Sequence, residues 1–252
     1  MFASEFIWCD LSTFDLAKAV AFYKNLFGWT THTLKGSTRD EDYTLFYAGM
    51  RSSAGIFTMS AFFQSIGMPS FWMSYVRVED LDASLDRAVG LGAKCEIEPT
   101  AFDARSRFAL IRDPSGAGFT LYEGPDLKGR DARGRPGCMV WNELHIPSLD
   151  RVASFYRDLF DWDIAPDPSS TGRHTIHSSR GTPIASILEL DEAIKGPKNY
   201  WAVYFAVRDI SAALRRIRAG GGSVLAEPAT MGAGFALAAD DQGAAFCLSD
   251  GS

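Results

Sequence analysis

An internal duplication is the feature of this sequence that most constrains its fold. Trp8 and Trp141 are 133 positions apart, and the same interval separates Phe22-Tyr23 from Phe155-Tyr156. Two later pairs of motifs keep their order while the interval falls to 129 and then to 127: Trp72-x-x-Tyr75 with Trp201-x-x-Tyr204, and Phe108-Ala109-Leu110 with Phe235-Ala236-Leu237. Matching motifs in a preserved order indicate a duplicated chain that has lost a few loop residues in its second copy.

The join between the two copies is expected where apolar periodicity is absent. Residues 125–137 are crowded with Pro, Gly, Lys, Arg and Asp, which is the composition of a linker. The 252-residue chain therefore divides into a first domain at 1–124, a linker at 125–137 and a second domain at 138–252. Each of the two domains has the length of an ordinary domain with a single core.

Each copy contains two units with the same order of predicted elements. In the first unit a strand-like alternation is followed by apolar residues at helical spacing, which continue until Gly28. We expect Ser12 or Thr13 to cap this helix, with Asp15 in its first turn. The sequence Asp113-Pro114-Ser115-Gly116 predicts a tight turn and a hairpin at the end of the second unit. The pattern is one strand, one helix and three strands (βαβββ), four times over, which predicts the α+β class.

Composition excludes several classes of protein. With 46% hydrophobic residues, 22% charged residues and a formal net charge of −6, the chain forms a core. It lacks the broad basic field that binds nucleic acid or an anionic membrane surface. No apolar run approaches the roughly 18 residues of a membrane span, and we expect no secretory leader. The four dispersed cysteines predict reduced thiols. We expect a cytoplasmic protein whose partner is a small molecule.

The repeated motifs resemble those of the vicinal oxygen chelate superfamily, which includes glyoxalases, bleomycin-resistance proteins and extradiol dioxygenases. The motifs are Phe22-Tyr23-x-x-Leu26-Phe27-Gly28-Trp29, Val78-x-Asp80-Leu81-Asp82-Ala83 and Asp113-Pro114-Ser115-Gly116-Ala117-x-Phe119, with their copies in the second half. The resemblance covers nearly the whole chain and extends to the tandem hydroxylase-like or glyoxalase-like branch. It implies two tandem glyoxalase-like domains, each a pair of βαβββ units forming open, barrel-like mixed sheets with helices outside.

Enzymes of that superfamily hold a divalent metal with His, Gln or Glu side chains at four strand positions. Carried over to this chain, these positions hold Trp8, Phe57, Met73 and Thr120 in the first half and Trp141, Leu188, Ala202 and Cys247 in the second. Divalent cations need a set of oxygen or nitrogen ligands, which these eight residues do not supply. We therefore expect no metal and no other cofactor.

The resemblance also places other side chains in the cup of each half, because residues two apart on a strand share a face. The first cup would add Asp10, Met59, Tyr75 and Tyr122 to those four, and the second would add Glu143, His145, Tyr204 and Ser249. Aromatic and apolar walls with a few polar groups are typical of small-molecule pockets. The indole rings of Trp8 and Trp141 would either stack on a planar ligand or plug cups that have lost their metal.

Asp10, Glu143 and His145 are the candidates for acid/base catalysis. Glu143 and His145 project from one face of one strand, and Asp10 is the duplicate of Glu143. An apolar cup would favour a protonated carboxyl group, and a neighbouring imidazole can transfer a proton. The alternative is a structural pair that satisfies backbone groups at the ends of the strands.

Arg107 is the candidate for binding an anionic group, with Arg77 and Arg105 nearby in the sequence. An arginine just before a strand can clamp a carboxylate or phosphate, and the alternative is a solvated or loop-capping residue. His174 and His177 have the spacing of two metal ligands on a helix. Their surroundings predict strand and loop instead, which would turn the two rings to opposite faces.

Three functions remain open. The first is a metal-free protein that binds a small organic metabolite or drug, with these ligand-binding residues: Trp8, Phe57, Met73, Tyr75, Arg107, Thr120, Trp141, Tyr204 and Cys247. The second is a metal-independent lyase, isomerase or hydroxylase-like enzyme that acts on a small carbonyl or polyketide-like substrate. The third is a scaffold with filled cups. Trp72 and Trp201 are expected to be exposed on the opposite face, for a dimer interface or helix packing, in a monomer or homodimer.

Overall fold

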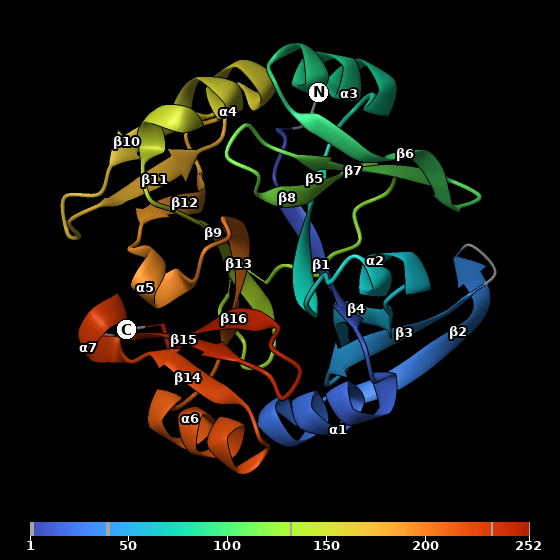
Figure 1. The fold of residues 1–252 in the computed structure, drawn as a ribbon, viewed down its shortest axis with the longest axis vertical. Helices are drawn as coiled ribbons and strands as arrows, with labels where there is room; N and C mark the ends of the chain where they lie inside the picture. The colour runs from blue at the N-terminus through green and yellow to red at the C-terminus, as the bar shows by residue number, and fades with distance from the viewer. Residues whose placement is uncertain (1–2, 39–40, 132, 233, 252) are drawn as a thin grey trace. The chain divides into compact units, whose positions relative to one another are not determined.

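A computed structural model describes residues 3–38, 41–131, 133–232 and 234–251, and its strands form two mixed sheets (Figure 1). The first sheet has the strand order β2-β3-β4-β1-β5-β8-β7-β6. Its strands are β1 (Phe6–Thr13), β2 (Thr30–Thr38), β3 (Glu41–Ala48), β4 (Arg51–Thr58), β5 (Phe71–Arg77), β6 (Lys94–Asp103), β7 (Ser106–Arg112) and β8 (Gly118–Glu123). The hairpin predicted at residues 113–116 joins β7 to β8.

The second sheet repeats the first strand for strand, in the order β10-β11-β12-β9-β13-β16-β15-β14. Its strands are β9 (Met139–Ile146), β10 (Asp163–Pro166), β11 (Arg173–His177), β12 (Pro183–Glu189), β13 (Tyr200–Ala206), β14 (Ser223–Ala226), β15 (Phe235–Ala239) and β16 (Ala245–Ser249). Among the described residues the end strands of each sheet do not pair, so neither sheet closes into a barrel. The predicted α+β class and the tandem arrangement of mixed sheets are confirmed.

Four of the described helices, including the longest, begin at an aspartate cap. The helices are α1 (Leu16–Phe27), α2 (Ala61–Ser65), α3 (Leu81–Gly90), the 3-10 helix η1 (Leu149–Arg151), α4 (Ala153–Phe160), α5 (Glu192–Lys195), α6 (Ile210–Ala219) and α7 (Pro228–Met231). The prediction that Ser12 or Thr13 caps α1 is wrong, because β1 continues through both residues. The carboxylate of Asp15 accepts from the backbone N–H of Lys18 at 3.0 Å instead. Gly28, with φ of 71°, ends α1 as predicted.

None of the helices in the described part of the chain combines the length and apolar character needed to cross a membrane.

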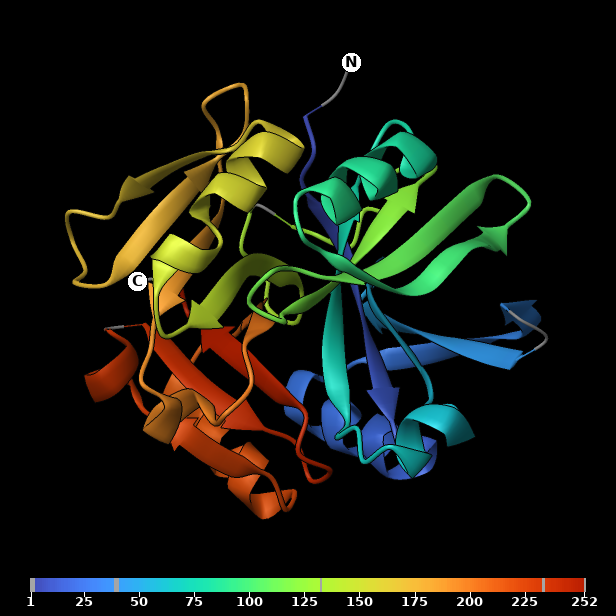
Figure 2. The same cartoon turned by 45° about the horizontal axis from the view of Figure 1, so that its top comes forward.

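The chain forms two compact units, and each takes one βαβββ unit from either half of the sequence. The first comprises Met1–Ile7, Ser74–Leu127 and Trp141–Ala202, and in it α3 packs against α4. The second comprises Trp8–Met73, Lys128–Val140 and Val203–Ser252, and in it α1 packs against α6, as Figures 1 and 2 both show. We call them the α3–α4 unit and the α1–α6 unit. The sheets thus join βαβββ units of the same half, whereas the cores join units of opposite halves.

The predicted linker contributes to the α1–α6 unit. The indole N–H of Trp29 donates to the carbonyl of Gly137 at 2.7 Å, and the N–H of Gly137 donates to the carbonyl of Ala206 at 2.8 Å. The backbone of Gly137 also has a φ of 80°, in the left-handed region that favours glycine. The domain boundaries at 124 and 138 stay predictions, since the compact units do not follow the order of the chain.

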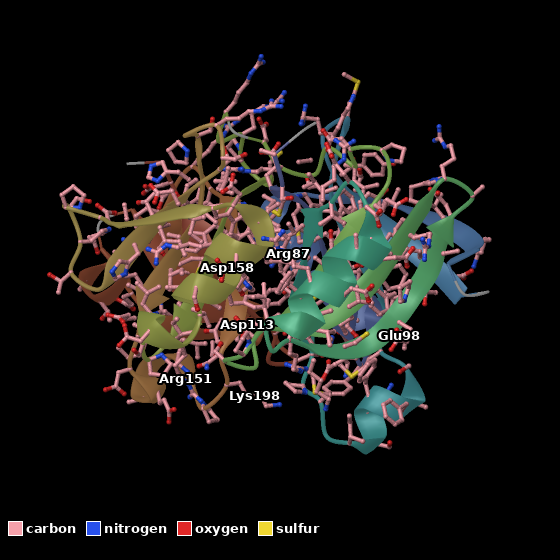
Figure 3. The ribbon with its side chains drawn as sticks, turned by 90° about the horizontal axis from the view of Figure 1, so that it is seen from above. Arg87, Glu98, Asp113, Arg151, Asp158 and Lys198 are labelled. Carbon is pink, nitrogen blue, oxygen red and sulfur yellow. The ribbon has the colours of Figure 1, made fainter. Side chains whose placement is uncertain are left out.

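The core of the α3–α4 unit contains a buried chain of polar groups. The indole N–H of Trp201 donates to the hydroxyl of Tyr156 at 2.8 Å, and that hydroxyl donates to Asp113 at 2.7 Å. Figure 3 shows α3 and α4 side by side and labels Asp113 near them. Burial raises the pKa of Asp113, and burial beside that carboxyl holds the pKa of Tyr156 well above its ordinary value.

The α1–α6 unit repeats this chain. The indole N–H of Trp72 donates to Tyr23 at 2.9 Å, and the Tyr23 hydroxyl donates to Asp240 at 3.0 Å. The expectation that the two tryptophans are exposed is wrong, because Trp72 and Trp201 have only 6% and 2% of their surface exposed. Each ring is covered by the helix that supplies its tyrosine, which is the helix-packing alternative.

Candidate functional site

The second half carries polar and aromatic side chains on one face of β9. Trp141, Glu143 and His145 alternate along this strand, and parallel pairing with β12 sets Ser186 opposite Glu143. Glu143 and His145 are almost fully buried, whereas Trp141 is half-buried. We call the group that they form with their partners the second-half wall: Trp141, Glu143, His145, Arg173, Ser186 and Tyr200. All six residues belong to the α3–α4 unit.

The carboxylate of Glu143 is the centre of this wall. Its Oε2 accepts from Nε of Arg173 at 2.7 Å and from the hydroxyl of Ser186 at 2.7 Å, and its Oε1 lies 3.1 Å from Nε2 of His145. Burying a carboxylate is unfavourable unless it is paired and hydrogen-bonded, and here a guanidinium and a hydroxyl supply both. The surroundings of Glu143 are therefore more polar than the apolar cup expected from the sequence, because β11 brings Arg173 against it.

His145 connects Glu143 to Tyr200 at the start of β13. Its Nδ1 lies 3.4 Å from the Tyr200 hydroxyl, and the two rings meet edge to face with centroids 5.3 Å apart. A neutral imidazole with its hydrogen on Nε2 would donate to Glu143 and accept from Tyr200, which satisfies both contacts. The row of groups from Tyr200 through His145 to Glu143 has the geometry of a proton relay between a half-buried hydroxyl and a buried carboxylate.

The ring of Trp141 is held in place by the same network. Its indole N–H donates to the Ser186 hydroxyl at 2.8 Å, and that hydroxyl in turn donates to Glu143. A half-buried aromatic ring with a fixed orientation is a preorganised surface for a flat ligand.

The first half carries a related group in the α1–α6 unit. The Tyr43 hydroxyl of β3 accepts from the indole N–H of Trp8 at 3.0 Å and donates to Asp10 at 3.1 Å. The Tyr43 ring stacks on Phe57, with centroids 6.2 Å apart. Burial, together with the nearby charge of Asp10, holds the pKa of Tyr43 well above its ordinary value, so the hydroxyl stays a donor. We call Trp8, Asp10, Tyr43 and Phe57 the first-half wall.

Strand register identifies which residues of the two walls correspond. Tyr43 lies two residues before the β3 residue that pairs with Gly55. Arg173 likewise lies two residues before the β11 residue that pairs with Ser186. Tyr43 therefore corresponds to Arg173, and Gly55 corresponds to Ser186. Both walls contain a tryptophan N–H that donates to a hydroxyl, which donates to a carboxylate. The hydroxyl comes from Tyr43 in the first half and from Ser186 in the second.

Other predicted ligand-binding residues lie on the neighbouring strands. Tyr75 pairs with Thr120 across β5 and β8, and Tyr204 pairs with Cys247 across β13 and β16. These four residues and Met73 are buried. The structure thus joins the predicted residues in cross-strand pairs, while their role in binding stays a prediction.

Arg107 lies apart from these residues, at the surface of the α3–α4 unit. Two of its guanidinium nitrogens donate to the carboxylate of Asp82 on α3, at 2.8 and 2.9 Å. The hydrogen bond from Arg107 lowers the pKa of the exposed Asp82. Arg77 is directed to the backbone, since its Nε donates to the carbonyl of Gly124 at 3.1 Å.

The family's metal does not fit the positions carried over from the resemblance. Trp141, Leu188, Ala202 and Cys247 hold these positions in the second half and offer no oxygen or imidazole ligand. The nearby Glu143 and His145 bond to each other, to Arg173 and to hydroxyls, and the guanidinium beside the carboxylate would repel a cation. Residues 3–38, 41–131, 133–232 and 234–251 include no group of three or more His, Cys, Asp or Glu placed to hold a metal.

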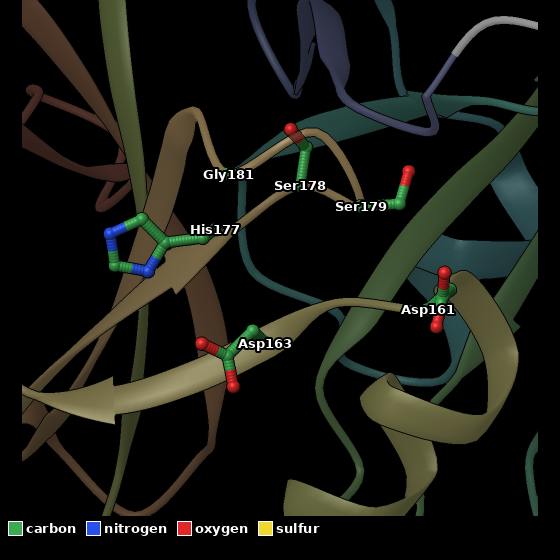
Figure 4. Close-up of a pocket in the computed structure, with 6 residues that line it drawn as sticks. All are labelled: Asp161, Asp163, His177, Ser178, Ser179 and Gly181. Carbon is green, nitrogen blue, oxygen red and sulfur yellow. The ribbon is translucent and has the colours of Figure 1, made fainter.

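His174 and His177 lie on β11, as the strand prediction required, and three residues apart on a strand they face opposite sides. His177 lines a hollow of about 440 Å³ beside β10 (Figure 4). Its other lining residues are polar or small: Asp161, Asp163, Ser178, Ser179 and Gly181. Both aspartates are exposed, so this hollow is a solvated surface feature of the α3–α4 unit.

Sequence reasoning missed four residues of the two walls: Tyr43, Arg173, Ser186 and Tyr200. Tyr43, Arg173 and Ser186 lie on strands whose loops differ between the halves, so no repeated motif marks them. Their correspondence follows from the pairing of β3 with β4 and of β11 with β12, which requires coordinates.

Family models match both halves of the chain. Residues 6–121 match the Glyoxalase/Bleomycin resistance protein/Dioxygenase superfamily, and residues 142–249 match the Glyoxalase-like domain. The protein named "Putative glyoxylase CFP32" of Mycobacterium tuberculosis is 29% identical over 244 residues, 96% of this chain and 92% of that protein. The anthracycline biosynthesis protein DauV of Streptomyces sp. (strain C5) is 30% identical over 240 residues, 88% of this chain and 83% of that protein.

Solved structures share the fold at low sequence identity. The 2,3-dioxygenase LapB from Pseudomonas sp. KL28 superposes with a TM-score of 0.62 at 15% identity, covering 99% of this chain and 93% of that one. The Mn(II)-bound glyoxalase from Novosphingobium aromaticivorans has a TM-score of 0.61 at 14% identity, with coverage of 98% and 82%. At these identities the likeness concerns the fold.

Proposed function

Because the chain belongs to the glyoxalase/bleomycin resistance protein/dioxygenase superfamily, we propose that its second-half wall binds a flat organic molecule without a metal ion. One observation carries this proposal: the half-buried ring of Trp141 is fixed by Ser186 beside a carboxylate that Arg173 already compensates. Such a wall offers an aromatic face together with polar groups of fixed direction, which is the composition of a small-molecule site.

The names of relatives support a ligand class. DauV and DnrV are both named anthracycline biosynthesis proteins, and each is 30% identical to this chain. Fused-ring polyketides of that kind are flat and carry hydroxyl and carbonyl groups. A flat ring system suits stacking on Trp141, and its oxygen atoms suit the hydroxyl of Tyr200 and the guanidinium of Arg173.

Titration with a dihydroxyanthraquinone, a fused-ring probe with phenol and carbonyl groups, tests the proposal. Calorimetry and quenching of tryptophan fluorescence should both report binding to the folded full-length chain. Trp141→Leu should weaken the affinity about tenfold or more, because the stacking surface is removed. Trp8→Leu, the same substitution at the duplicate position, is the matched control and should change affinity by less than about twofold. Equal losses in both variants would contradict the assignment to the second-half wall.

The metal-free part of the proposal has its own test. Affinity for the probe should be unchanged when the protein is dialysed against a chelator, because the wall's own residues make the contacts. A stoichiometric divalent ion in the purified protein, whose removal abolishes binding, would overturn this part.

A second candidate function is supported by the relay from Tyr200 through His145 to Glu143. In this alternative the chain is a metal-independent enzyme that moves a proton next to a carbonyl or phenol of a polyketide-like substrate. The Tyr200 hydroxyl would meet the substrate, His145 would accept or return its proton, and Glu143 would stabilise the charged imidazole. His145→Asn should then abolish a measured turnover while leaving probe binding within about threefold, and Tyr200→Phe should abolish turnover as well. Unchanged turnover in both variants would exclude this alternative.

A further inference from the structure

The two walls differ at one place, where Tyr43 of the first half crosses the backbone of β4. A Cβ atom added at Gly55 would lie 1.8 Å from the Tyr43 hydroxyl oxygen and 2.2 Å from its Cζ, so the ring rests directly on this glycine. The backbone of Gly55 is not in the left-handed region. Glycine is therefore needed there for close approach and not for backbone conformation.

The contacts of the Tyr43 ring are those that a protein would make with a phenol. Its hydroxyl lies between the indole N–H of Trp8 and the carboxylate of Asp10, and its face stacks on Phe57. The side chain is 96% buried, and Trp8 beneath it has only 3% of its surface exposed. One stacking partner, one donor and one acceptor around a buried ring satisfy both the apolar and the polar parts of a phenol.

The second-half wall is built so that this ring is not required. Ser186 stands at the position of Gly55 and supplies the hydroxyl between Trp141 and Glu143. Arg173 stands at the position of Tyr43 and directs its guanidinium to the carboxylate. The polar contacts of the first half are thus reproduced without an aromatic ring at this position, and the indole of Trp141 is half-buried.

We propose that Tyr43 is a built-in occupant of the first-half wall, so that each chain binds a single ligand, at the second-half wall. The statement about Tyr43 stands on the geometry of the first half alone. The statement about a single ligand rests on the proposed function. The class of molecule that fits the first-half wall, once Tyr43 is removed, is a simple phenol.

Tyr43→Ala tests the first statement with p-cresol, a small phenol that carries the ring and the hydroxyl of the removed side chain. At about ten times its Kd, p-cresol should raise the Tm of this variant by about 3 °C, and it should leave wild type unchanged. Toluene, which lacks the hydroxyl, should give a smaller shift. Tyr47→Ala removes a half-buried tyrosine from the same strand and should not respond to p-cresol. If Tyr43→Ala is unfolded alone, refolding in p-cresol should restore its circular dichroism. A variant that p-cresol neither stabilises nor refolds would overturn the proposal.

Calorimetric stoichiometry with the dihydroxyanthraquinone tests the second statement. Wild type should bind one molecule per chain, and Trp141→Leu should weaken binding at that site about tenfold or more. Two equivalent molecules per wild-type chain would overturn the single-ligand inference while leaving the proposed function intact. No binding to wild type, together with p-cresol binding to Tyr43→Ala, would overturn the proposed function while leaving the role of Tyr43 intact.

Discussion

The burial of Glu143 depends on Arg173, whose guanidinium compensates the carboxylate inside the second-half wall. We expect Arg173→Met to lower the free energy of unfolding by about 3–5 kcal/mol, because one charge would be left buried without its partner. Urea denaturation measures this loss. The double variant Arg173→Met/Glu143→Gln should recover much of it, since the uncompensated charge is gone.

Arg107→Met is the matched control for that change. Its pair with Asp82 is exposed to solvent, so the free energy of unfolding should fall far less than in Arg173→Met. If the two arginine variants were equally destabilised, the buried pair would not have the role given to it here.

Gly55 is expected to tolerate no side chain as long as Tyr43 is present. Gly55→Ala should destabilise the protein by about 1–3 kcal/mol, because the added methyl group would overlap the tyrosine ring. In the background of Tyr43→Ala the same change should cost much less, which a double-mutant cycle by urea denaturation would detect. Gly90→Ala, at a position with open space around it, is the control and should be close to neutral. Additive effects of the two changes would contradict the contact.

At the scale of elements, each polar chain of tryptophan, tyrosine and aspartate attaches one helix to a sheet. Tyr156 belongs to α4, and its hydroxyl joins Trp201 of β13 to Asp113 of the turn between β7 and β8. Tyr156→Phe should lower the free energy of unfolding by about 1–3 kcal/mol, because two buried groups lose a partner. Tyr23→Phe should have a similar effect in the other unit, and a Tm measurement on both variants checks the equivalence. If only one of the two variants lost stability, the two tryptophan–tyrosine–aspartate hydrogen-bond networks would not be equivalent.

The buried aspartates of these chains give stability a defined dependence on pH. Burial raises the pKa of Asp113 and of Asp240 above the ordinary value of 3.8, so the folded state holds their protons more tightly than the unfolded state. The two aspartates therefore contribute fully to the free energy of unfolding when the pH is below their pKa in the unfolded chain. This contribution is lost as the pH rises through their pKa values in the folded protein.

Asp113→Asn removes the titratable carboxyl of Asp113, so a comparison with wild type measures how much this group contributes to stability at each pH. The free energy of unfolding of wild type minus that of Asp113→Asn should fall as the pH rises above the ordinary aspartate pKa of 3.8. Asp82→Asn is the control, because the pKa of this exposed carboxyl is lowered in the folded protein. The free energy of unfolding of wild type minus that of Asp82→Asn should therefore rise weakly with pH. A difference that rises with pH for Asp113 would contradict the assignment.

At the scale of the whole molecule, the two compact units explain why the duplicated halves need one another. Each core combines residues of both halves, for example Phe119 with Tyr156 in the α3–α4 unit and Tyr23 with Phe246 in the α1–α6 unit. A separate half would expose one side of each of the two cores to water.

We expect residues 1–124, expressed alone, to self-associate or aggregate, and we expect mixing with residues 138–252 to give a 1:1 complex. Size-exclusion chromatography with light scattering measures both outcomes, and the same experiment decides between monomer and homodimer for the full chain. A stable, folded monomer of residues 1–124 would contradict the mixed cores.

Local pattern predicted much of the fold. The intervals between repeated motifs identified the duplication, and alternation and helical spacing identified the strands and helices, because both patterns are local properties of the chain. The cap of α1 was misplaced by two or three residues, because a strand that runs to Thr13 cannot be distinguished by pattern from a cap at that residue. Trp72 and Trp201 were predicted to be exposed because pattern does not indicate which helix covers a sheet.

The sequence alone determined the repeated architecture, the residue types at the positions carried over from the resemblance, and the common face of Glu143 and His145. Only the tertiary structure decided the partners of those residues. Arg173 and Ser186 reach Glu143 through strand pairing over 30 and 43 positions, and Tyr43 reaches Asp10 over 33. The pairing of βαβββ units across the halves could not be predicted from the sequence either, because the apolar face of a unit can be buried against either of two equivalent neighbours. The physical reason is that the local sequence pattern indicates which face of a helix or strand is apolar, whereas tertiary packing determines which other element covers that face.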